Sequence, residues 1–171
     1  MFRTMFIAVL SCLLFSSTAF AGGIGIVDFQ KAINEVKEGK SAKSKIDSMF
    51  SQKRSALQQK EKELKDKVAA YEQQRSLLSP TARQEQEQSL MMMQQQLQQM
   101  LMQSEQEVQQ VYAKEMESLI GKMKDISASI GKEKDLDLIL EATESGIVYK
   151  SSSVVDLTSD LIKRYDAKYG G

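Results

Sequence analysis

The sequence predicts a mainly α-helical protein with a small β part, in which a long antiparallel coiled-coil hairpin arm projects from a small β-stranded oligomerisation head. Three observations predict this fold class. Only one Pro and nine Gly interrupt 171 residues that are rich in strong helix formers. Apolar residues recur at heptad spacing in the middle of the chain. Short β-branched runs lie only near the two ends.

Residues 1–21 have the features of a secretory signal peptide. Arg3 is followed by an apolar stretch over residues 6–15, and a small-x-small cleavage pattern ends at Ala21. Cleavage there would leave 150 residues with no Cys and a net charge of −1. A lipoprotein acylated at Cys12 is the less favoured alternative, because too little apolar sequence would precede the cut. The sequence therefore predicts a soluble, exported mature chain, since no other apolar run approaches membrane length.

The segment that follows predicts one strand and one short helix. Residues 24–27 are apolar and mostly β-branched, as in a strand. Residues 29–37 place apolar side chains on one helical face, and Gly39 has the position of a C′ glycine that ends such a helix. Residues 22–40 are therefore expected to form the first part of the head.

Residues 41–132 are expected to form the arm. Ser79 followed by Pro80 is typical of a helix start, so two helices are predicted, over 41–78 and 80–132. Half of a heptad seam in the first helix is apolar, at Phe50, Leu57, Leu64, Tyr71 and Leu78. The other half is largely polar. A tight turn near 79–80 makes the helices antiparallel, with residue 79 − k opposite residue 80 + k.

Residues 133–171 are expected to complete the head. Residues 136–143 alternate Leu with acidic side chains, and a turn at 144–146 leads to an apolar run at 147–150, which together predict a β-hairpin. Asp156 then opens a last helix. Its expected apolar side comprises Leu157, Leu161, Ile162 and Tyr165. The arm pairing puts Lys132 opposite Val27, which brings the first strand beside this hairpin.

The head has only 58 residues, and the sequence holds no staple that would stabilise so small a domain. Three short strands would also leave open edges. Both facts favour self-association through the head. The residues best placed for a shared core are Ile24, Ile26, Leu138, Leu140, Ile147 and Tyr149.

Several kinds of chemistry are excluded or disfavoured. The chain has no His, one Cys and no glycine-rich phosphate-binding motif, so we expect no enzyme activity, no cofactor and no Cys/His metal site. The 23 basic and 23 acidic residues cancel, which disfavours a nucleic-acid partner. Residues 43–67 carry a local excess of positive charge, either as a solvated face with local ion pairs or as a mildly basic wall of the arm.

Gln and Met crowd residues 84–111. Successive helical residues are 100° apart, so neighbouring Met side chains cannot share one seam. Flexible thioethers on an exposed face suit a surface that accepts many partners, whereas the alternative is gap filling in a loose seam. The candidate client-binding residues are Met91, Met92, Met93, Met100 and Met102.

Gly39 and Gly121 are expected at the same level of the hairpin, where the arm leaves the head. Each glycine weakens a helix by about 1 kcal/mol relative to Ala. The pair is therefore a candidate hinge that lets the arm splay. The alternatives are a helix cap at Gly39 and close helix packing at Gly121.

Three segments resemble the Skp/OmpH family of periplasmic chaperones: residues 24–36 (IGIVDFQKAINEV), 135–150 (DLDLILEATESGIVYK) and 155–162 (VDLTSDLI). The resemblance implies a homotrimer with a central β-barrel and helical arms around a cavity. The cavity would hold unfolded outer membrane proteins before insertion. The best-known member is strongly basic and is linked to lipopolysaccharide and membrane binding. This chain is near neutral, so no lipid-binding residues are carried over.

The expected function is therefore that of an ATP-independent holdase chaperone in the periplasm, whose partners are unfolded outer membrane proteins. A structural coiled-coil scaffold or spacer of the cell envelope is the alternative from another class. A scaffold predicts a continuously apolar seam and no apolar excess away from it. The half-polar seam and the Met clusters favour the chaperone. A lipid-binding protein is third, because the charges balance.

Overall fold

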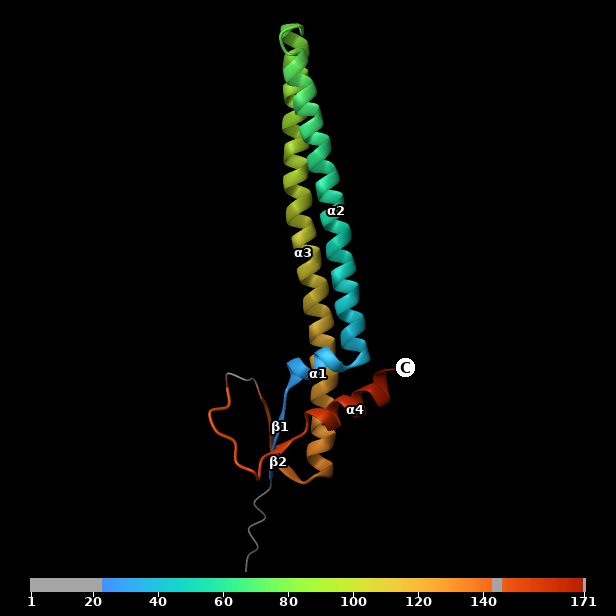
Figure 1. Ribbon diagram of the computed structural model, residues 1–171, viewed down its shortest axis with the longest axis vertical. Coiled ribbons are helices and arrows are strands. Elements are labelled where there is room, and N and C mark those ends of the chain that lie inside the picture. Colours follow the sequence, from blue (N-terminus) through green and yellow to red (C-terminus); the bar gives the residue numbers. More distant parts are fainter. Residues whose placement is uncertain (1–22, 143–145, 171) are drawn as a thin grey trace, which may run out of the picture.

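The computed structural model describes residues 23–142 and 146–170, which form a head and one long arm (Figure 1). The elements are β1 (Gly23–Val27), α1 (Phe29–Glu35), α2 (Lys37–Gln74), α3 (Pro80–Glu133), β2 (Leu136–Glu141), β3 (Val155–Asp156) and α4 (Thr158–Tyr169). The predicted fold class is confirmed. The predicted signal peptide lies outside the described residues. None of the described helices is long and apolar enough to cross a membrane.

Helix α1 is short because the chain turns sharply into the arm. Asp28 caps its start, where the carboxylate accepts a hydrogen bond from the Lys31 backbone nitrogen at 2.7 Å. Val36 is extended and separates α1 from α2. Gly39 therefore does not end the first helix, as the sequence predicted, but lies in the first turn of α2. A Cβ at this position would lie 1.8 Å from the Ile33 carbonyl oxygen, so the lack of a side chain permits a close approach.

The arm consists of α2 and α3, packed antiparallel. The connection is longer than predicted, because α2 ends at Gln74. Helix α3 starts as predicted, with the Ser79 hydroxyl accepting a hydrogen bond from the Ala82 backbone nitrogen at 3.2 Å and Pro80 in first position. At 1.5 Å per residue, α2 is about 57 Å long and α3 about 81 Å long. The longer α3 continues past the base of α2 into the head (Figure 1).

Ion pairs across the arm show its register. Three of them, each with an N–O distance of 2.5 Å, join Lys45 to Glu115, Lys53 to Glu107 and Lys122 to Glu38. Each partner lies within one residue of the position that the predicted pivot gives. The sequence therefore predicts the antiparallel register correctly, although the turn is longer than the sequence predicts.

The head contains a three-stranded sheet in the order β2-β1-β3, in which both pairings are parallel. The arm is thus the crossover connection between β1 and β2. The predicted β-hairpin is wrong. Residues 147–150 form no strand. Strand β2 pairs with β1 and not with residues 147–150. Apolar alternation indicates a strand without specifying its partner, and residues 143–145 of the predicted turn lie outside the described residues.

The core lies where α1, the base of α3 and α4 meet the sheet. Its largest fully buried side chains are Val27, Val36, Leu119, Met123, Ile130, Leu157, Leu161 and Tyr165. Three of the four apolar residues predicted for the last helix are among them, and Ile162 packs against the cluster. Because α3 supplies several of these residues, the arm and the head share one core.

Candidate functional site

One face of the sheet leaves apolar side chains uncovered. Ile24, Leu138 and Leu140 are 43%, 47% and 48% exposed, whereas Ile26 is buried. The register places Ile24 beside Leu138 and Ile26 beside Leu140. The structure therefore brings four of the six candidate oligomerisation residues together on adjacent strands, and the three exposed ones, Ile24, Leu138 and Leu140, form a sheet patch. Clustered exposed apolar side chains are typical of a surface that another chain covers.

The other two candidates, Ile147 and Tyr149, do not join the sheet patch through strand pairing. They lie in the irregular segment between β2 and β3. Tyr149 is 84% exposed, and its neighbour Val148 is fully exposed. An apolar segment of this kind is not stabilised by the single chain, so burial against another chain would be favourable.

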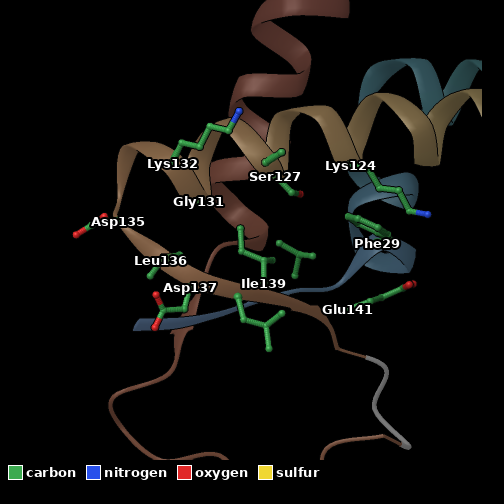
Figure 2. A pocket seen from close by; sticks show the side chains of 13 residues that line it. Phe29, Lys124, Ser127, Gly131, Lys132, Asp135, Leu136, Asp137, Ile139 and Glu141 are labelled. Carbon is green, nitrogen blue, oxygen red and sulfur yellow. The ribbon is translucent and has the colours of Figure 1, made fainter. Parts of the chain in front are cut away.

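A hollow of about 650 Å³ lies between the base of α3 and β2. Figure 2 shows Ser127 and Gly131 of α3 over Ile139 of β2. The lack of a side chain at Gly131 allows Ile139 to pack closely, because Ile139 Cδ1 would lie 3.1 Å from a Cβ at position 131. The Ser127 hydroxyl is buried and has no hydrogen-bond partner among the described residues. The hollow is lined by an edge strand, so its wall also carries backbone groups with no strand partner in the described chain.

The five candidate Met residues divide into two sets. Met91, Met92 and Met102 are 61%, 51% and 50% exposed. Met93 and Met100 are half-buried and line the seam between α2 and α3. The prediction that neighbouring Met residues cannot share one seam is confirmed. The exposed set is the better placed of the two to contact another molecule directly.

The two candidate hinge residues lie at the same level of the arm, because the neighbouring Glu38 and Lys122 form an ion pair. Gly39 is packed tightly against α1. Gly121 is exposed, and a Cβ at this position would meet no atom within 4 Å, so its alternative role in close helix packing is wrong. Only Gly121 is free of a packing constraint, and the hinge stays a prediction.

A polar cluster joins the arm to α4 at this level. The Glu38 carboxylate accepts hydrogen bonds from Lys122 Nζ at 2.5 Å and from the Tyr165 hydroxyl at 2.7 Å. The Lys122 ammonium also lies 4.9 Å from the centre of the Tyr169 ring. One carboxylate on α2 is thus bound by α3 and α4 together. Sequence reasoning missed this cluster, although the predicted pivot places residue 38 next to Lys122.

The pKa values in this cluster follow from its contacts. Burial acts to raise the pKa of Glu38, but the hydrogen bonds from Lys122 and Tyr165 outweigh it, so the pKa lies below its ordinary value. Burial, and then the hydrogen bond to Glu38, raises the pKa of the Tyr165 phenol. Glu38 is therefore ionised and Tyr165 protonated at neutral pH, which keeps the cluster intact.

The basic run over residues 43–67 is largely neutralised by ion pairs. Lys45 and Lys53 bind acidic residues of α3. Lys60, Lys62 and Lys67 bind acidic residues of α2 itself. This pattern favours the alternative of a solvated face with local pairs over a basic wall. Among the described residues, no group of three or more acidic, His or Cys side chains is placed to hold a metal ion.

A small parallel sheet with an exposed apolar patch, joined through one shared core to a long two-helix arm, defines the class of protein by its fold. A family model described as "Outer membrane protein (OmpH-like)" matches residues 23–165. The chain therefore belongs to the OmpH-like family, which confirms the resemblance seen in the sequence.

The fold is also similar to a solved structure, that of an OmpH-like outer membrane chaperone from Caulobacter crescentus CB15. The TM-score is 0.75 at 15% sequence identity, and the similarity covers 86% of this chain and 85% of the other. At this identity the similarity establishes the fold. No curated protein matches the chain.

Proposed function

We propose that the protein is an ATP-independent holdase chaperone, which binds unfolded outer membrane proteins and prevents their aggregation before membrane insertion. The observation that carries the proposal is the arm of an OmpH-like chain with half-exposed Met residues away from its seam. A spacer has no use for apolar side chains on its solvent face. A chaperone needs them, because unfolded clients expose apolar segments of varied sequence.

Weak contacts are sufficient for this task. Each exposed Met adds little affinity, but several arms around one client raise the effective concentration of every further contact. The client can then be held without being ordered, and no nucleotide is needed for its capture. The proposal includes no catalytic activity and no cofactor.

We further propose that the head forms a homo-oligomer, and the family suggests a trimer. The sheet patch of Ile24, Leu138 and Leu140 would then be covered by the same patch of other copies. The open edges of β2 and β3 allow neighbouring sheets to pair into a barrel. Ile147 and Tyr149 would be buried as the neighbouring segments meet. Removing this much exposed apolar surface from water favours association.

The proposed location is the periplasm, reached by a signal peptide that is cleaved at about Ala21. The sequence pattern of residues 1–21 and the family support this placement. The balanced charge and the paired cations of the basic run give no support to lipopolysaccharide, membrane or nucleic-acid binding.

The proposal is tested by dilution of a urea-unfolded outer membrane barrel protein into buffer with and without the mature chain. Light scattering should fall at near-stoichiometric chaperone, and ATP should make no difference. An unrelated helical protein at equal mass concentration is the control, and a soluble unfolded client run in parallel measures selectivity. Scattering as high as with the control protein would refute the proposed function.

A further inference from the structure

A second hollow, of about 670 Å³, lies halfway along the arm between α2 and α3. Phe50 and Leu57 line it from α2, and Leu101 and Val108 line it from α3. Phe50 and Leu101 are 56% and 41% exposed, so an apolar surface is open to solvent. The volume lies within the range of roughly 300–1,000 Å³ that is usual for ligand pockets.

Ser104 is the one small residue at a seam position beside the hollow. Residues 97, 101, 104, 108 and 111 of α3 follow an unbroken heptad spacing, and all except Ser104 are Leu or Val. Ser104 is buried and lines the hollow. A hydroxymethyl group replaces the branched aliphatic side chain that would otherwise fill the seam. A small residue at this seam position leaves room that a branched side chain would occupy.

Three charged residues line the hollow: Lys53, Arg54 and Glu105. Arg54 lies on α2 and Glu105 on α3. Neither forms an ion pair within the part of the chain that the structure describes, in contrast to nearby Lys53, which binds Glu107. Glu107 neutralises Lys53, and the charges of Arg54 and Glu105 cancel, so the rim does not favour a polyanion. A guanidinium and a carboxylate on opposite sides do match the carbonyl acceptors and N–H donors of an extended backbone.

We propose that this hollow is an anchoring subsite for one large apolar side chain of an extended, unfolded polypeptide. Arg54 donates hydrogen bonds to the backbone carbonyls of that polypeptide, and Glu105 accepts them from its N–H groups. The subsite rests on the proposed chaperone function and adds to it a defined point of attachment. It lies apart from the exposed Met residues and contacts the client through a built cavity.

The variant Ser104→Leu tests the subsite, because the larger side chain is expected to fill the hollow while every charged residue at its rim is unchanged. Unfolding should occur at the same or a higher temperature, since an apolar side chain completes the seam. Affinity for a fluorescently labelled, urea-unfolded barrel protein should fall by about tenfold, the loss expected when one large apolar side chain stays in water. Gln106→Leu is the matched control, because it adds the same side chain at an exposed position outside the hollow.

The outcomes separate the subsite from the chaperone function. If the Ser104→Leu variant is folded and binds client with wild-type affinity, the subsite is refuted. The chaperone function still stands in that case if the wild-type protein protects the client from aggregation. Failure of the wild-type protein to bind the client would refute both. If Ser104→Leu lowers the unfolding temperature, the variant Phe50→Ser replaces it, because Phe50 is an exposed apolar residue that lines the hollow. Its affinity for client should also fall by about tenfold, and unchanged affinity would overturn the subsite.

A photo-crosslinking amino acid in place of Arg54 identifies the occupant. We expect crosslinks to the labelled unfolded client, and excess unlabelled client added before irradiation should reduce their yield. Crosslinks between two copies of this chain that persist with client would show that a neighbouring arm fills the hollow. Crosslinks to lipid, formed when phosphatidylethanolamine–phosphatidylglycerol vesicles are supplied in place of client, would identify an acyl chain as the occupant. Either result overturns the proposal.

Discussion

Replacing only the exposed Met residues should separate client binding from arm stability. The variant carries Met91→Gln, Met92→Gln and Met102→Gln, while Met93 and Met100 in the seam stay unchanged. Gln has nearly the helix propensity of Met, so the arm should remain helical. Since the three side chains are at least half exposed, each change should alter the free energy of unfolding by no more than about 0.5 kcal/mol.

The expected effect on binding follows from the same exposures. Full burial of a Met side chain contributes about 1.5–3 kcal/mol, and half of the surface of each is already covered by its own chain. A client that covers the remainder gains about 1 kcal/mol per residue, or about 3 kcal/mol for three. The affinity of one arm should therefore fall by about a hundredfold, as an upper limit, and protection against aggregation should fall with it.

The assay is fluorescence anisotropy of a labelled, unfolded barrel protein, combined with thermal unfolding and sedimentation of each variant. The reciprocal control is Met93→Gln with Met100→Gln, which should lower the unfolding temperature and leave the affinity per folded molecule almost unchanged. If the exposed set loses stability while its affinity is unchanged, the three residues serve packing and the argument for a binding surface is wrong.

The remaining predictions concern the head and the base of the arm. Leu138→Asp places a charge in the proposed interface, and sedimentation should show monomer; a particle of wild-type size would contradict this. Tyr165→Phe removes the hydrogen bond to Glu38 and should cost about 1–3 kcal/mol in denaturant unfolding. Because the pKa of Glu38 lies below its ordinary 4.5, its contribution to stability is complete above that pH and is lost as pH falls through the lower folded-state pKa; Glu38→Gln should remove this part of the acid-unfolding profile. Gly39→Ala should destabilise the protein, since its Cβ would meet a carbonyl oxygen. Gly121→Ala should stabilise it by about 1 kcal/mol and, if the hinge exists, narrow the distances between spin labels at the arm tips; a distribution already narrow in the wild type would exclude the hinge.

The arm could be predicted because its signals are local or periodic. Ser79 and Pro80 mark a helix start through their own backbone preferences, and heptad spacing identifies the facing sides. Once the turn is placed, antiparallel geometry fixes which residues face each other, and the ion pair of Lys45 with Glu115 lies where that rule puts it to within one residue.

The sheet could be predicted only in part, because strand pairing is decided by contacts far apart in the sequence. Ile147 and Tyr149 alternate as a strand would, yet β1 pairs with β2 and leaves them uncovered. Gly39 shows the same limit of sequence-based prediction. The sequence does not distinguish a glycine that ends a helix from a glycine that allows a neighbouring backbone to approach closely. The gap at Ser104 was visible in the heptad spacing, but its openness to solvent depends on the side chains of α2.

The parallel pairing of β1 with β2 and β3 has a consequence for how the chain reaches its fold. Strand β1 is the first described element, and both of its partners come after the whole arm, more than a hundred residues later. The sheet therefore cannot begin to form until the residues that follow the arm are available to pair with β1. The hairpin, by contrast, can close progressively from its tip, where contacts are local and the entropic cost of loop closure is small. Each cross-arm contact formed from the tip downwards would bring β1 and β2 nearer, so we expect the arm to form before the sheet.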